Sequence, residues 1–160
     1  MSSRRKFIQN TAVALSASSL LPYIGAATPA AKNTNAKKEF LETGMAGYSF
    51  VNYSIDQTIA MMNRIAIHNL SLKEFHLPLD SSQEKINEVV GQFKAGGINI
   101  YATGVIYMKT EAEVDRAFAY SKKVGVDLIV GVPTYELLVY TEKKVKEHNI
   151  KIAIHNHGPE

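Results

Sequence analysis

Short apolar runs alternate with amphipathic stretches along most of this chain. The apolar runs are rich in β-branched and aromatic residues, and each ends at a polar residue, Gly or Pro. Strands are predicted at 45–50, 70–77, 98–107, 127–132 and 151–157. Successive starts lie roughly 25 residues apart, which is the length of one β/α unit. The pattern therefore predicts five β/α units in series.

Helix signals occupy the segments between these runs. Three segments open with the spacing of a capping box, a hydroxyl residue followed three positions on by Gln or Glu: Ser54 and Gln57, Ser81 and Glu84, Thr110 and Glu113. Gly96-Gly97 and Gly125 then end two of the predicted helices, because glycine readily adopts the conformation that closes a helix. A fourth helix is predicted over 134–148.

Strands joined through helices form parallel sheets with right-handed crossovers. Such a sheet is either an open doubly wound sheet or part of a (β/α)8 TIM barrel. Residues 44–49, which overlap the first predicted strand, lack the glycine spacing of a nucleotide-binding loop. The α/β TIM-barrel type is therefore favoured. A complete barrel usually takes ~250 residues, so we expect one truncated to about five units.

Residues 1–31 carry the features of an export signal. Arg4 and Arg5 belong to a basic start, and the uncharged run 11–27 is rich in Ala, Ser and Leu. The paired arginines resemble a bacterial twin-arginine signal, a route that exports folded proteins. A membrane anchor is the alternative, but the run is shorter than the ~20 strongly apolar residues of a span and contains Pro22. We expect a periplasmic protein with no stable membrane insertion after signal cleavage.

The remaining chain divides into a flexible linker at 32–43 and a domain at 44–160. The whole chain has a formal net charge of +3, but several of its basic residues belong to the leader. The domain is therefore near neutral, and no nucleic-acid partner is expected. The chain has no Cys, which excludes a disulfide, a cysteine zinc site or a thiol nucleophile.

Candidate chemistry gathers at the end of the fifth predicted strand. His155 and His157 are two positions apart, so on a strand both imidazoles point to the same side. Neutral imidazole ligates divalent metals and transfers protons near neutral pH. The alternative is that either ring caps the barrel or bonds a loop carbonyl. Glu160 is a candidate ligand, a candidate base, or the first residue of an exposed loop.

Other strand ends offer further candidates. Glu74 and His76 share a face in the second predicted strand, so the carboxylate could orient the imidazole or accept a substrate proton; a Glu74–Lys73 contact is the structural alternative. Tyr107 and Lys109 are candidates for binding a sugar, with packing and solvation as their ordinary roles.

Four strand-end segments together, 74–78, 104–107, 131–133 and 154–160, resemble the sugar phosphate isomerase/epimerase family of the xylose isomerase-like TIM barrels. The chain is most similar to the N-terminal part of exported bacterial members. This resemblance implies a barrel that binds a small-molecule carbohydrate and a divalent metal (Mn, Zn, Co, Fe or Mg), and that moves a proton next to the sugar carbonyl.

The resemblance also implies roles for individual residues. His155 stands where the wider superfamily has a metal-binding Glu, and His76 matches a histidine at the substrate mouth. His157 and Glu160 are the implied catalytic or substrate-side groups, whereas Glu74 is a catalytic candidate from its place in the second predicted strand. The family's other ligands come from strands six to eight, which this chain lacks, so we interpret it as incomplete.

Two other functions stay open from the sequence. The same enediolate chemistry supports a lyase or hydratase that acts on keto-sugars. The second alternative is a non-catalytic, carbohydrate-binding half-barrel that covers its exposed sheet edges by self-association. An inactive remnant is a third interpretation.

Overall fold

A computed structural model of the protein describes residues 42–156. The predicted signal peptide, most of the predicted linker, and the candidates His157 and Glu160 lie outside the described residues. Between residues 42 and 156, no helix has the length and apolar content that crossing a bilayer requires.

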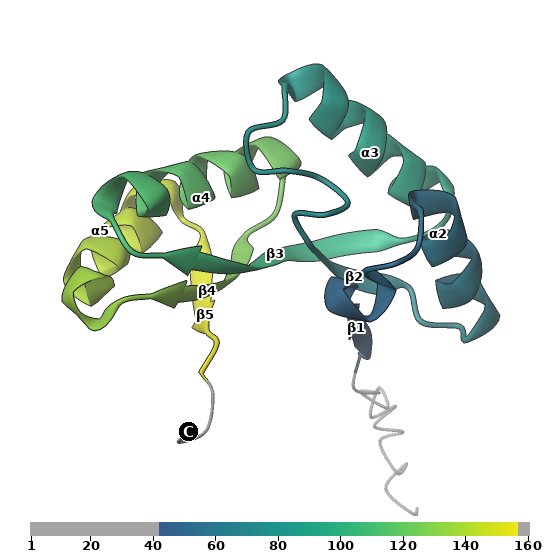
Figure 1. The fold of residues 1–160 in the computed structure, drawn as a ribbon, viewed down its shortest axis with the longest axis horizontal. Coiled ribbons are helices and arrows are strands. Elements are labelled where there is room, and N and C mark those ends of the chain that lie inside the picture. The colour runs from purple at the N-terminus through teal and green to yellow at the C-terminus, as the bar shows by residue number, and fades with distance from the viewer. Residues whose placement is uncertain (1–41, 157–160) are drawn as a thin grey trace, which may run out of the picture. The chain divides into compact units, whose positions relative to one another are not determined.

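The described chain alternates strands with helices, as the sequence pattern predicts (Figure 1). All strands pair in parallel within one five-stranded sheet. In chain order the elements are β1 (Gly44–Ala46), η1 (Gly47–Phe50), α2 (Ile55–Arg64), β2 (Asn69–Leu72), α3 (Gln83–Ala95), β3 (Asn99–Met108), α4 (Glu111–Val124), β4 (Leu128–Pro133), η2 (Tyr135–Leu137), α5 (Leu138–His148) and β5 (Lys151–Ile154).

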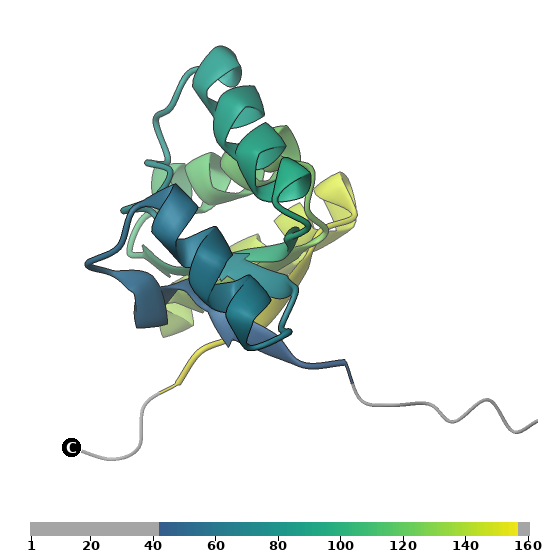
Figure 2. The same ribbon diagram turned by 90° about the vertical axis from the view of Figure 1, so that its right-hand side faces the viewer.

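The order of strands in the sheet decides between the two candidate architectures. It runs β1-β2-β3-β4-β5, the same as the order along the chain. A doubly wound sheet reverses its order at a switch point and carries helices on both faces. Here α2 to α5 lie on one face, and consecutive helices contact one another (Figures 1 and 2). The predicted TIM-barrel type with five β/α units is confirmed.

The core lies between the sheet and the helix layer. Its fully buried side chains come from both layers: Leu70, Leu72 and Ile129 from strands, and Met62, Phe93 and Phe118 from helices. Each such side chain contributes about 1.5–3 kcal/mol through burial of apolar surface. This packing fixes which face of the sheet points away from the helices.

Three predicted strands are longer than the strands in the structure. The first ends at Ala46, where the chain turns into η1 so that Phe50 enters the core. The second ends at Leu72, because the amides of His76 and Leu77 both bond the Lys73 carbonyl oxygen in a turn. The fifth strand ends at Ile154 rather than at 157.

The capping signals hold with two corrections. Ser54 and Gln57 form the predicted box, with both reciprocal hydrogen bonds present. The next helix is capped by Ser82, because the Ser81 amide is already bonded to the Pro78 carbonyl oxygen. Thr110 accepts from the Glu113 amide as expected, but the Glu113 carboxylate accepts from Lys109 N instead of closing the box on Thr110.

Candidate functional site

The face of the sheet opposite the helices, here called the inner face, carries a cavity of about 650 Å³. Ser71, Tyr107 and Val130 line it, and they alternate along their strands with buried core residues such as Leu72 and Ile129. Because successive strand residues point to opposite faces, the cavity lies on the side away from the helices.

Polar residues line this cavity at the carboxyl ends of several strands. Tyr48 follows β1, Lys73 and Glu74 follow β2, Tyr107 lies near the end of β3, and His155 follows β5. The carboxyl ends of parallel strands share one edge of a sheet, and this edge carries the active site in TIM-barrel enzymes. The structure thus brings three of the predicted site residues, Glu74, Tyr107 and His155, to one cavity.

His155 is half-buried and sits directly after β5. Its backbone N–H donates a hydrogen bond of 2.9 Å to the Gly131 carbonyl oxygen, which continues the pairing of β4 with β5 by one residue. This bond holds His155 against the sheet, beside the cavity that the residue lines.

Lys73 is a cavity residue that the sequence places at a strand end but predicts only as a contact of Glu74. Its Nζ donates a hydrogen bond of 3.0 Å to the Val105 carbonyl oxygen, and the side chain is half-buried. The sequence also offers a contact between Lys73 and Glu74, and no ion pair joins these two residues in the described part of the chain. The signal that could have found Lys73 is its position two residues beyond Ser71, on the same face of the strand.

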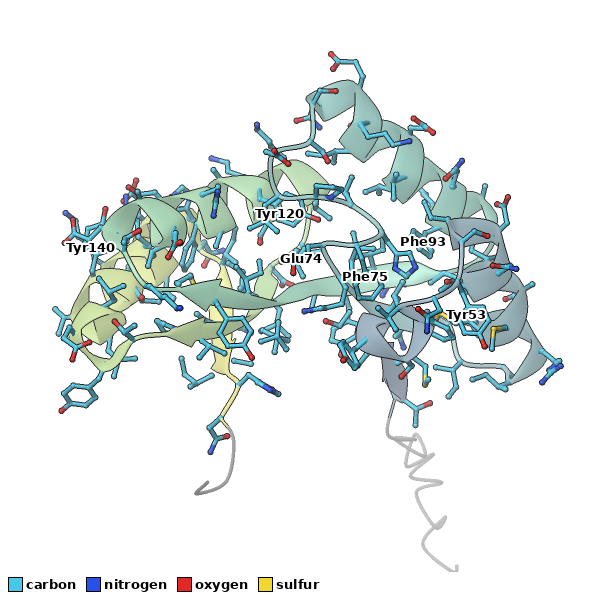
Figure 3. The ribbon with its side chains drawn as sticks, viewed as in Figure 1. Tyr53, Glu74, Phe75, Phe93, Tyr120 and Tyr140 are labelled. Carbon is cyan, nitrogen blue, oxygen red and sulfur yellow. The ribbon has the colours of Figure 1, made fainter. Side chains whose placement is uncertain are left out.

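His76 lies on the opposite side of the sheet from the cavity. Its Nε2 is 3.1 Å from the Tyr53 carbonyl oxygen and 3.4 Å from Thr58 Oγ1. The ring packs edge-on against Phe75 and Phe93, which lie with Tyr53 on the helix side (Figure 3). The turn that begins at Lys73 carries His76 off the sheet, so it does not share a face with Glu74.

The environment of His76 favours the neutral form of its ring. Burial lowers the pKa of His76, and the hydrogen bond to Tyr53 opposes this shift only partly. Nδ1 is buried and has no hydrogen-bond partner among the residues of the described range. These contacts fit a residue that connects the turn after β2 to the helix layer.

Lys109 also differs from its expected place. It is exposed and is not among the residues that line the cavity. Its backbone N–H donates to Glu113 Oε2 at 2.6 Å, so the residue takes part in the start of α4. Tyr107, two positions earlier, lines the cavity and leaves 55% of its surface exposed.

The described residues do not form a divalent-metal site by themselves. Within 42–156, no three His, Asp or Glu side chains converge so that they could hold an ion. Glu74 and His155 supply suitable donors at the cavity, but Lys73 places a positive charge there as well. Metal sites usually need three or four protein ligands. The divalent metal therefore stays a prediction for this chain.

Comparisons with known proteins show the fold. No protein-family model and no curated protein matches the sequence. The chain is similar to a solved structure of an uncharacterised protein from Parabacteroides distasonis ATCC 8503, with 26% identity and a TM-score of 0.66 over 71% of this chain and 52% of the other.

Two further solved structures carry informative descriptions. One is a xylose isomerase domain-containing protein from Salmonella typhimurium LT2, with 14% identity and a TM-score of 0.53 over 69% of this chain and 47% of the other. The fold is that of the xylose isomerase-like TIM barrels. The other is a xylose isomerase-like TIM barrel/4-hydroxyphenylpyruvate dioxygenase fusion protein, with 14% identity and a TM-score of 0.52 over 69% of this chain and 21% of the other. The chain spans about half the length of the first two.

Proposed function

We propose that this protein acts on a small carbohydrate as an isomerase or epimerase, by moving a proton next to the sugar carbonyl. The observation that carries the proposal is the inner-face cavity, which joins Glu74 and His155 at the carboxyl edge of the sheet. The xylose isomerase-like fold supports it, since this edge is where TIM-barrel enzymes bind substrates.

The cavity offers groups suited to a sugar. Tyr48, Tyr101 and Tyr107 line it, and each combines an apolar ring face with a hydroxyl group. The C–H surfaces of a sugar pack on such rings, while its hydroxyl groups bond to phenols. A volume of about 650 Å³ lies within the range of small-molecule sites.

Glu74 is the proposed base. Its carboxylate takes the proton from the carbon next to the sugar carbonyl, and the C–H electron pair forms the carbon–carbon double bond of an enediol. The carbonyl oxygen receives the displaced electron pair and then a proton. Protonation of the former carbonyl carbon, while the hydroxyl group on the adjacent carbon loses its proton and becomes the new carbonyl, gives the isomer. Protonation of the original carbon on its opposite face, while the former carbonyl oxygen loses its proton again, gives the epimer. His155, at the same cavity, is the second candidate for proton transfer.

Several parts of the proposal rest on the sequence resemblance. These are the roles of His157 and Glu160, the divalent metal with His155 as one ligand, and export to the periplasm. Calorimetric titration of the full chain with Mn²⁺, Zn²⁺ and Co²⁺, beside the His155→Ala variant, tests the metal. Identical heats for the two proteins would remove His155 from the ligand set.

The test of function follows hydrogen exchange in the substrate. The protein is incubated in D₂O with a panel of aldoses, ketoses and sugar acids, and NMR records loss of the C–H signal next to the carbonyl. We expect exchange with at least one sugar, reduced about 100-fold or more by Glu74→Gln. Glu88→Gln is the matched control, because Glu88 is exposed on α3 and pairs with Lys85.

The outcomes separate the competing functions. Exchange that is equal in wild type and Glu74→Gln would remove Glu74 as the base. Loss of water from a keto-sugar, seen as a new unsaturated carbonyl signal, would indicate the lyase or hydratase. Binding of a sugar, with no hydrogen exchange in any sugar of the panel, would indicate a carbohydrate-binding protein and end the isomerase proposal.

A further inference from the structure

The Lys73 side chain is held between two neighbouring elements. Gly47, the first residue of η1, packs so closely that a Cβ there would lie 3.1 Å from Lys73 Cγ and 2.6 Å from the Ser71 carbonyl oxygen. At its other end, Lys73 Nζ is bonded to the Val105 carbonyl oxygen of β3. The aliphatic stem and the ammonium group are thus both positioned, and the residue lines the inner-face cavity.

An irregularity in β3 provides the partner for Lys73. The register between β3 and β4 pairs Gly104 with Val130 and Ile106 with Gly131, and it passes over Val105. A residue left out of the ladder needs another partner for its backbone groups. Lys73 supplies one to the Val105 carbonyl, so the ammonium stays at the cavity instead of extending into water.

The ammonium group of Lys73 forms no ion pair within the described residues. The ion pairs found between residues 42 and 156 involve Lys85, Lys144, Lys146 and His148, but not Lys73. An ammonium group has three N–H donors, and the neutral Val105 carbonyl takes one of them. A half-buried cation gains more from an anionic partner than from a neutral one.

The residues that line the cavity favour a carboxylate over a phosphate group. Phosphate sites in barrels commonly use backbone amides at a helix N-terminus. None of the residues that line this cavity belongs to the first turn of α2, α3 or α4. One lysine beside tyrosine side chains instead matches a single negative charge on a ligand whose C–H faces can pack on the rings and whose hydroxyl groups can bond to the phenols.

We infer that Lys73 binds the carboxylate of an acidic sugar, such as a uronic or aldonic acid, in the inner-face cavity. The inference deepens the proposed function, on which it rests, by naming the substrate class. Lys73 is a specificity-determining residue here: it anchors the acid group, while Glu74 acts on the carbon next to the carbonyl.

The test measures binding of the full chain to matched sugars by calorimetry. Each hexuronate is compared with the neutral hexose of the same configuration and with its 6-phosphate. We expect one hexuronate to bind about 10- to 100-fold more tightly than its neutral hexose. Lys73→Gln abolishes this preference, Lys73→Arg retains most of it, and Lys143→Gln, on the exposed side of α5, leaves it unchanged.

Several results would overturn the inference. These are equal affinity for acid and neutral sugar, a preference for the 6-phosphate, or a preference that survives in Lys73→Gln. Thermal denaturation shows whether Lys73→Gln remains folded. If it unfolds, two other measurements test the inference: the ratio of hexuronate to hexose affinity in wild type, which should fall at high salt, and the same ratio in Lys73→Arg, which should be largely retained. Hydrogen exchange in a neutral sugar without acid preference would end this inference alone. Acid-selective binding without exchange would end the isomerase proposal alone.

Discussion

The hydroxyl group of Tyr120 donates a hydrogen bond of 2.9 Å to the carbonyl oxygen of Leu77. Tyr120 lies on α4, and Leu77 lies in the turn after β2, which also carries Glu74 (Figure 3). The bond therefore anchors this turn, which carries the candidate base, to the helix layer. Burial raises the pKa of Tyr120, and the negative charge of Glu74 raises it further, so the hydroxyl stays a donor.

Removal of this hydroxyl group should destabilise the protein. Tyr120→Phe leaves the Leu77 carbonyl without its donor in a buried place, so we expect the free energy of unfolding to fall by about 1–3 kcal/mol. Urea denaturation followed by circular dichroism measures the change. Tyr140→Phe is the control: its hydroxyl bonds the exposed Asp115, and its loss should cost about 0.5 kcal/mol or less. Equal losses in the two variants would contradict the role of the Leu77 contact.

His76 should make stability depend on pH. Burial lowers its pKa in the folded protein, whereas the unfolded chain has the ordinary value of about 6.5. The unfolded state therefore binds a proton more readily as the pH falls. The free energy of unfolding is expected to decrease below about pH 6.5 and to be insensitive to this residue above it.

The measurement is denaturation from pH 5 to pH 8 in wild type and in His76→Leu. The variant removes the titrating group, so its slope below about pH 6.5 should be smaller. His68→Leu serves as control, because His68 is exposed and its removal should leave the slope intact. A slope that is unchanged in His76→Leu would refute the assignment.

Gly104 should tolerate no side chain. Its φ of +123° is unfavourable for other residues, and a Cβ would lie 2.0 Å from the Val130 carbonyl oxygen. Gly104→Ala must therefore push β3 away from β4, and we expect a loss of about 3 kcal/mol or more. Gly91→Ala is the matched control. Nothing lies within 4 Å of that position on α3, so it should gain about 0.5–1 kcal/mol. Thermal unfolding compares the two variants.

Self-association stays a prediction, and we propose that β5 carries it. β5 pairs only with β4 among the described strands, and beside it lies an apolar groove of about 420 Å³ that Leu138, Val145 and Ile154 help to line. A second copy of the chain would cover both. Sedimentation velocity should show a dimer that Ile154→Lys weakens about tenfold or more. Val139→Lys should leave the dimer unchanged, because Val139 is exposed on α5 outside the groove. A folded monomer at every concentration would contradict the proposal.

The sequence alone determined the local structure and its repetition. Apolar runs and capping residues such as Ser54 and Thr110 depend on neighbours within a few positions, so five strands and their helices could be predicted. The favoured barrel type followed from the same repeat, and the observed strand order confirms it. Glu74, Tyr107 and His155 could be selected because strand ends meet at one edge of a parallel sheet.

The tertiary structure decided which strand-end residues share the cavity. Alternation assigned Glu74 and His76 to one face, but this rule holds only while the chain remains a strand, and β2 ends at Leu72. The turn that follows sends His76 into the helix layer and leaves Lys73 at the cavity. The register shift at Val105 that holds Lys73 depends on pairing between segments far apart in the chain. Such long-range pairing leaves no periodic signal in the sequence.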